Sequence, residues 1–299
     1  MAERPIFILG PTGSGKSAVA VELAEQLGDA EIVSADAYQV YRELPILTAA
    51  PGARERARVP HHLVGFMGVE ENNDAALHAR RALEAIRDIA ARGKRAIVTG
   101  GSGLYVKFIS HGISPAPPSD PALRAKLNAL PPEEAVRRLQ EADPAGAAAT
   151  NLQNPRYVVR NLEIVLLGDK PLSYWQQNWR HGAAGPGFVI TRETAELDAR
   201  IAHRTAAMLQ GGALDEVRAV AGKPLSATAA KTLGLPQIMQ HLQGGESDTA
   251  QLQADIHLAT RQYAKRQRTW LRREDWLTPL AADAAATPAG LAGRIAQLL

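Results

Sequence analysis

The chain contains no cysteine, which excludes disulfide bridges and thiolate metal sites. No apolar run approaches the roughly 20 residues of a membrane span, and no apolar signal-peptide segment precedes the first strand-like stretch. The formal net charge is only +3 over 299 residues, so the total charge does not identify a nucleic-acid binder. From these absences we expect a soluble, cytoplasmic, monomeric protein without membrane attachment.

A phosphate-binding loop stands near the N-terminus. It comprises Gly10, Pro11, Thr12, Gly13, Ser14, Gly15, Lys16 and Ser17 (GPTGSGKS). The apolar run IFIL precedes it, and a helical pattern that stops at Gly28 follows it, which is the context such a loop needs. Backbone N–H groups at the helix N-terminus form an anion cradle, Lys16 adds a positive charge, and the Ser17 hydroxyl suits Mg²⁺. The loop predicts phosphate binding and leaves the reaction type open.

Strand-like and helical patterns alternate through the first hundred residues. Apolar runs at Pro5–Leu9, Glu31–Ala35 and Arg95–Thr99 predict strands, and helical spacing of apolar residues lies between them. Such alternation predicts an α/β fold, here a P-loop NTPase-like parallel sheet flanked by helices. Ligands of such sheets bind where the strands end.

A Pro-rich stretch, His111–Pro121, interrupts this pattern and indicates a domain edge. Beyond it the chain is helical and rich in Ala, Arg and Glu, until Gly187–Glu193 predicts a strand that returns to the sheet. We therefore expect a catalytic core from residues 1–115 and 187–299, with a helical insertion domain at 116–186.

Polar residues follow two of the predicted strands. Asp36 comes after the second strand, where a carboxylate forms a turn or helix cap, or acts as a base or metal ligand; the sequence leaves these alternatives open. Ser102 follows the third strand in a Gly-rich turn and offers a hydroxyl near the phosphates. The adjacent His61 and His62 are more typical of a structural role than of a shared metal site.

The segment 259–274, ATRQYAKRQRTWLRRE, predicts a basic helix. Arg261, Lys265, Arg268 and Arg272 fall on one face, and no acidic residue occurs between Ala259 and Arg273. Charged helix faces normally carry both signs, so this face indicates a polyanion-binding surface.

Five motifs together resemble the tRNA dimethylallyltransferases, which prenylate the adenosine next to the anticodon. The family's GPTxSGK[ST], DSxQVY, VPHHL, GGTGLY and RxAKRQxTWxR are here GPTGSGKS, DAYQVY, VPHHL, GGSGLY and RQYAKRQRTWLR. Their order and spacing agree from residue 5 to about residue 275. The resemblance implies transfer of a dimethylallyl group from dimethylallyl diphosphate to N6 of the adenosine at position 37 of tRNA.

The same resemblance implies site residues. The loop from Gly10 to Ser17 would hold the pyrophosphate, with Mg²⁺ on Ser17. Asp36 would be the general base, Ser102 would lie at the reaction channel, and Arg204 would contact the pyrophosphate beside Lys16. The tRNA would be contacted by Asp36, Ala37, Tyr38, Gln39, Ser102, Arg124, Arg156, Tyr157, Arg160, Lys231, Gly234 and Gln237.

The sequence departs from the family pattern at several positions expected to face RNA. These are Ala37, Ala50, Tyr157, Leu235 and Pro236. Two alternatives therefore remain: a small-molecule or nucleotide kinase, on the phosphate loop alone, and a non-catalytic RNA-binding protein, on the changed RNA-facing positions.

Overall fold

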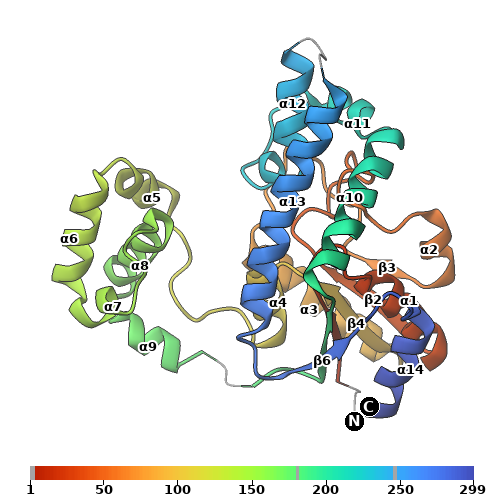
Figure 1. The fold of residues 1–299 in the computed structure, drawn as a ribbon. Coiled ribbons are helices and arrows are strands. Elements are labelled where there is room, and N and C mark those ends of the chain that lie inside the picture. The colour runs from red at the N-terminus through yellow and green to blue at the C-terminus, as the bar shows by residue number, and fades with distance from the viewer. Residues whose placement is uncertain (1–3, 180–181, 245–247) are drawn as a thin grey trace. The chain divides into compact units, whose positions relative to one another are not determined.

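A six-stranded parallel sheet forms the centre of the computed structural model, which describes residues 4–179, 182–244 and 248–299. The strand order is β3-β2-β4-β1-β5-β6, and each strand pairs in parallel with its neighbours. The strands are β1 (Ile6–Leu9), β2 (Ala30–Ala35), β3 (His61–His62), β4 (Arg95–Gly100), β5 (Gly187–Thr191) and β6 (Leu277–Ala281). The predicted parallel α/β sheet is confirmed (Figure 1).

The sequence patterns located four strands and missed two. The fourth ends at Thr191, two residues before the predicted end at Glu193, and α10 begins at Thr194. The missed strands, β3 and β6, occupy the two edges of the sheet. β3 has only two residues, and β6 contains Pro279, which edge strands tolerate because one side of an edge strand makes no ladder hydrogen bonds.

Two helices, α1 (Lys16–Leu27) and α14 (Pro288–Leu298), pack together and share a core cluster with the sheet. Ile6 and Ile8 of β1 point into this cluster together with Leu23 of α1 and Leu291 of α14. Burial of this continuous apolar surface is the main favourable contribution to holding the two helices on the sheet. The short helix α2 (Ala53–Arg58) contacts α1.

Helices α3 (Ala75–Ala91) and α4 (Gly103–Ser110) pack on each other and on β2. The buried side chains of α3 include Ala79, Ala82 and Ile89. Small residues on this face let the helix approach the strands closely. Gly93, with a positive φ, follows the end of the helix.

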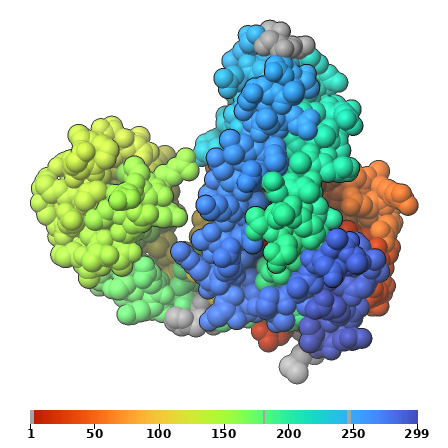
Figure 2. Space-filling view, viewed as in Figure 1, coloured from red at the N-terminus to blue at the C-terminus, as the bar shows by residue number. Residues whose placement is uncertain are grey.

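A group of C-terminal helices forms a second apolar cluster with the segment from Val40 to Val69. Its elements are α10 (Thr194–Gln210), α11 (Ala213–Val220), the 3₁₀ turn η1 (Ala229–Lys231), α12 (Leu235–Gln243) and α13 (Thr249–Leu271). Helices α10 and α13 lie side by side on the face shown in Figures 1 and 2.

The chain divides into two compact units, Met1–Ser110 with Gly182–Leu299, and His111–His181. The second unit contains α5 (Pro121–Asn128), α6 (Pro132–Ala142), α7 (Pro144–Ala148), α8 (Pro155–Gly168) and α9 (Leu172–Gln177). The Pro-rich stretch belongs to this unit, because Ser119 and the Asp120 amide donate hydrogen bonds to the fully buried Glu163 of α8.

Candidate active site

The phosphate-binding loop connects β1 to α1, as its sequence motif requires. Gly15 stands at the N-cap of α1 with φ 91°, a left-handed conformation that residues with a Cβ rarely adopt. The Gly10 amide donates to the Gly100 carbonyl at 3.3 Å, which ties the start of the loop to β4. The loop thus presents backbone N–H groups at a helix N-terminus, the arrangement that binds phosphate.

Strand register brings Asp36 to the same place. Leu9 and Ala35 both lie opposite Gly100, so β1, β2 and β4 end together. Asp36 follows β2 directly, and its Oδ1 accepts the Tyr38 amide at 2.9 Å. Asp36 therefore forms a turn, which is one of the alternatives read from the sequence, and it also lines the cavity described next.

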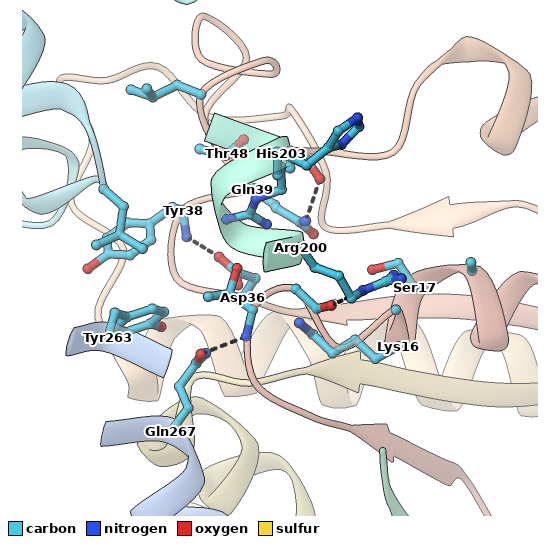
Figure 3. Close-up of a pocket in the computed structure, with 18 of the residues that line it drawn as sticks. Lys16, Ser17, Asp36, Tyr38, Gln39, Thr48, Arg200, His203, Tyr263 and Gln267 are labelled. Carbon is cyan, nitrogen blue, oxygen red and sulfur yellow. Dashed lines mark hydrogen bonds between the residues drawn. The ribbon is translucent and has the colours of Figure 1, made fainter. Parts of the chain in front are cut away.

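One cavity of about 660 Å³ opens above these strand ends (Figure 3). Its lining combines loop residues, the segment after β2, helix α10 and helix α13. The residues are Thr12, Gly13, Gly15, Lys16, Ser17, Ala18, Asp36, Tyr38, Gln39, Leu47, Thr48, Ala49, Glu55, Ala199, Arg200, His203, Arg204, Thr232, Leu233, Tyr263 and Gln267.

Positive charge gathers on the phosphate-loop side of the cavity. Burial lowers the pKa of Lys16 to about 8, although the Asp36 carboxylate acts in the opposite direction, and the charge of Arg204 lowers it further. Burial also lowers the pKa of Arg204. Arg200 Nε donates to the Gly13 carbonyl at 2.8 Å, so α10 and the phosphate loop are joined directly. An anionic ligand would relieve the repulsion among these cations.

Helix α13 supports the loop from the other side. Gln267 is buried, and its Oε1 accepts the Thr12 amide at 2.8 Å. Tyr263 lines the cavity, and its hydroxyl lies 3.0 Å from Ser102 Oγ. Ser102 itself is buried behind the lining and accepts the Ala37 amide at 3.4 Å, so it orders the turn that carries Asp36.

Gln39, expected to contact the tRNA, has both ends of its amide engaged within the protein. Its Oε1 accepts from Ser34 Oγ at 2.9 Å, and its Nε2 donates to the Ala49 carbonyl at 3.1 Å. The side chain thus bridges β2 and the loop that carries Thr48, and it faces the cavity in that fixed orientation (Figure 3).

The structure brings some predicted site residues to the cavity and not others. Lys16, Ser17, Asp36, Tyr38, Gln39 and Arg204 line it, with Thr12, Gly13 and Gly15. The remaining loop residues Gly10, Pro11 and Ser14 are buried under it, as is Ala37. Lys231, Gly234 and Gln237 do not line it, although Thr232 and Leu233 of the same segment do.

The residues expected to touch tRNA from the insertion belong to the second unit. Arg156 and Tyr157 are exposed at the start of α8. Arg124 and Arg160 instead donate to the buried carboxylate of Glu163. Part of the basic surface read from the sequence is therefore engaged in holding this unit together.

The basic face of α13 borders a groove of about 460 Å³ between α10 and α13. All four basic residues read from the sequence line it. The charge of this face is less uniformly positive than the sequence of α13 alone indicates. Asp198 of α10 contributes a carboxylate there, which pairs with Arg261 at 2.9 Å and with His257 at 3.0 Å.

Sequence reasoning missed several lining residues. Arg200, His203 and Arg204 stand at positions i, i+3 and i+4 of one helix, so helical spacing around Arg204 could have found the other two. Tyr263 lies within the predicted basic helix, and its side chain reaches the cavity. The aliphatic side chains Leu47 and Leu233 carried no sequence signal, because only the tertiary fold places them there.

In residues 4–179, 182–244 and 248–299, no cluster of three His, Asp or Glu side chains is arranged to hold a metal ion. Within the same ranges, no helix has the length and apolar character needed to cross a bilayer.

Comparisons with known proteins agree on one family. The family model described as IPP transferase matches residues 39–274. A tRNA dimethylallyltransferase from Akkermansia muciniphila is 58% identical over 294 residues, covering 98% of this chain and 99% of that protein.

Solved structures agree as well. A tRNA isopentenylpyrophosphate transferase from Bacillus halodurans has 28% identity and a TM-score of 0.72, covering 99% of this chain and 96% of that one. A eukaryotic dimethylallyltransferase crystallised acting on tRNA has 24% identity and a TM-score of 0.84 over 98% of this chain and 77% of that one, which shows a shared fold. This chain therefore belongs to the IPP transferase family, which includes the tRNA dimethylallyltransferases.

Proposed function

We propose that the protein transfers a dimethylallyl group from dimethylallyl diphosphate to N6 of the adenosine at position 37 of tRNA, beside the anticodon. The observation that carries the proposal is one cavity in which a phosphate loop, two arginines and a carboxylate face one another. Full-length similarity to tRNA dimethylallyltransferases supports it. We further propose that the protein acts as a monomer in the cytoplasm, where tRNA is available.

The reaction joins a weak nucleophile to an allylic electrophile. The N6 lone pair attacks C1 of the donor, the C1–O bond breaks, and pyrophosphate leaves with the bonding electrons. N6 then carries an extra proton, which must go to a base. Because the N6 lone pair is delocalised into the ring, the protein has to align the reactants and remove that proton.

Asp36 suits the role of base. Its Oδ1 is fixed by the Tyr38 amide, which leaves Oδ2 to accept the N6 proton. The half-buried carboxylate lies in Figure 3 between Tyr38 and the phosphate loop, where an adenine and the donor carbon would meet. A positioned general base contributes about 10²–10⁴-fold to the rate.

Charge develops on the pyrophosphate as the C1–O bond breaks. The loop amides, Lys16, Arg200 and Arg204 all lie on the phosphate-loop side of the cavity, where this charge would form. Groups preorganised in a partly dry site stabilise such charge more strongly than water does.

The site residues fit Mg²⁺. Ser17 and Asp36 offer oxygen ligands on the same cavity. Mg²⁺ typically takes only one or two protein ligands and fills its other positions with substrate phosphate oxygens and water, so a large protein ligand cluster is not required. We propose that Ser17 holds the ion, and when bound it neutralises charge on the diphosphate.

The adenine reaches the cavity only if it leaves the stacked anticodon loop. We propose that Ala37, Tyr38 and Gln39 border the extruded base, with Lys231, Gly234 and Gln237 nearby. Arg124, Arg156, Tyr157 and Arg160 of the insertion would contact the RNA further out. Such contacts predict tRNA binding that weakens with salt.

The test is transfer of label from radiolabelled dimethylallyl diphosphate to bulk tRNA in the presence of Mg²⁺, with ATP turnover measured in parallel. We expect labelled adenosine in the tRNA and no ATP turnover. ATP turnover without label would instead establish a kinase. Salt-sensitive tRNA binding with no product from any allylic diphosphate would establish a non-catalytic RNA-binding protein.

A further inference from the structure

The cavity has two chemically different sides. Lys16, Arg200 and Arg204 occupy the side next to the phosphate loop. The only aliphatic side chains larger than alanine among the described lining residues are Leu47 and Leu233. In Figure 3, Thr48, the neighbour of Leu47, lies across the cavity from Lys16. A donor with its diphosphate on the loop would direct its apolar chain away from the cations and toward this wall.

Leu47 belongs to a loop between β2 and α2 that has no regular secondary structure. Within this loop the backbone forms consecutive turns. The Thr48 N–H donates to the Leu44 carbonyl at 3.0 Å, and the Ala50 N–H donates to the Pro45 carbonyl at 2.9 Å. Ala49 has φ 48°, an unfavourable conformation for a residue with a Cβ. Contacts from elsewhere are therefore needed to keep this loop in one arrangement.

Glu216 of α11 supplies the strongest of these contacts. One carboxylate oxygen accepts the Ile46 amide at 2.7 Å, and the other accepts the Leu47 amide at 2.9 Å. The ionised carboxylate thus satisfies two consecutive backbone donors, and hydrogen bonds to charged groups are stronger than neutral ones. The other end of the loop is held at Ala49 by Gln39.

Packing holds the Leu47 side chain as firmly as its backbone. Leu47 is 4% exposed and belongs to the cluster formed with α11, α12 and α13. A Cβ at Gly234, whose φ is 88°, would lie 2.8 Å from Leu47 Cδ1. The fold therefore leaves the side chain one position, at the boundary between the core and the cavity.

We propose that Glu216 is a positioning residue that fixes Leu47 as the end wall of the prenyl pocket, and that this wall restricts the donor to a five-carbon chain. The inference rests on the proposed function, since it assigns a place to the donor's apolar part. A fixed wall excludes the additional carbons of geranyl diphosphate by overlap, whereas a loosened loop or a smaller side chain admits them.

The test compares kcat/KM for dimethylallyl and geranyl diphosphates with the full chain and bulk tRNA. The ratio of the two values does not depend on how much of a preparation is folded, so loss of stability alone does not change it. The variants are Glu216→Gln, which keeps the shape and loses one acceptor, and Leu47→Ala. Asp215→Asn is the matched control, because Asp215 is exposed on the same helix and pairs with Arg218. Glu216→Asp, which withdraws the carboxylate, replaces Glu216→Gln if that variant does not fold.

We expect wild type and Asp215→Asn to prefer the five-carbon donor equally, and both Glu216→Gln and Leu47→Ala to lower that preference at least about tenfold. If Leu47→Ala keeps the wild-type preference for the five-carbon donor, Leu47 is not the end wall of the pocket. If only Glu216→Gln keeps that preference, Glu216 is not a positioning residue. A wild-type enzyme that uses both donors equally also overturns the inference. If wild type transfers no prenyl group at all, the proposed function fails instead.

Discussion

At the scale of single residues, the two carboxylate oxygens of Asp36 have different roles, one structural and one proposed to be catalytic. Its Oδ1 closes a turn with the Tyr38 amide, and its other oxygen is the proposed proton acceptor. In Asp36→Asn the amide oxygen can still accept from Tyr38, but the group no longer takes a proton. We expect kcat to fall about 10²–10⁴-fold. The KM for dimethylallyl diphosphate should not rise, because removing a negative charge beside Lys16 favours an anionic ligand.

Steady-state kinetics with both substrates would measure these changes. Asp29→Asn is a suitable control, since Asp29 is exposed just before the start of the same strand. Full activity in Asp36→Asn would contradict the assignment of the base.

Lys16 gives a prediction of pH dependence. Burial holds its pKa at about 8, below the ordinary 10.5, so in the free enzyme it is charged below about pH 8 and neutral above it. An uncharged lysine binds a diphosphate less well. We therefore expect kcat/KM for dimethylallyl diphosphate to decline as pH rises through about 8, with the change mainly in KM.

Lys16→Arg provides the comparison, because arginine stays charged throughout this range. Its profile should lack the decline near pH 8, even though its activity is lower. A wild-type profile that stays flat to about pH 9.5 would contradict the role of the Lys16 charge.

At the scale of elements, the buried side chain of Gln267 joins α13 to the phosphate loop. Gln267 accepts the Thr12 amide, so in Gln267→Leu that buried N–H has no partner. Loss of such a partner costs about 1–3 kcal/mol and disturbs the loop. We expect kcat/KM for dimethylallyl diphosphate to fall about tenfold.

Donor titrations and thermal unfolding of Gln267→Leu and Gln262→Leu would check this prediction. Gln262 is exposed on the same helix, so its variant carries the same change in composition. Equal effects of the two substitutions would show that the Gln267–Thr12 contact does not support the loop.

The elements differ in how far the sequence reveals them. The strand, loop and helix around Lys16 are encoded within some twenty consecutive residues, by apolar runs and glycines, so local patterns were enough. Asp36 could be placed because parallel strands end on one side of a sheet. The roles of Gln267, Glu216 and Leu47 could not be predicted from the sequence. They depend on tertiary contacts between a helix and a loop that are far apart in the chain. β6 was missed since an edge strand with a proline has no distinctive pattern.

At the scale of the whole molecule, the two units differ in what stabilises each of them internally. The core unit has a sheet and large apolar clusters. The second unit has a smaller apolar cluster and the fully buried carboxylate of Glu163, which accepts from Arg124, Arg160, Ser119 and the Asp120 amide. Perturbing Glu163 should therefore affect the insertion and leave the diphosphate site intact.

The substitution Glu163→Gln tests that separation. It removes a buried charge on which two arginines converge, and we expect it to destabilise the second unit by about 1–3 kcal/mol. Hydrogen exchange should accelerate within residues 111–179, while the strands of the core keep their protection.

If the insertion binds tRNA as proposed, the KM for tRNA should rise several-fold and the KM for dimethylallyl diphosphate should not change. Glu141→Gln, which breaks an exposed pair with Arg137, should alter neither. A Glu163→Gln enzyme with faster exchange but an unchanged KM for tRNA would remove the insertion from the proposed tRNA-binding surface.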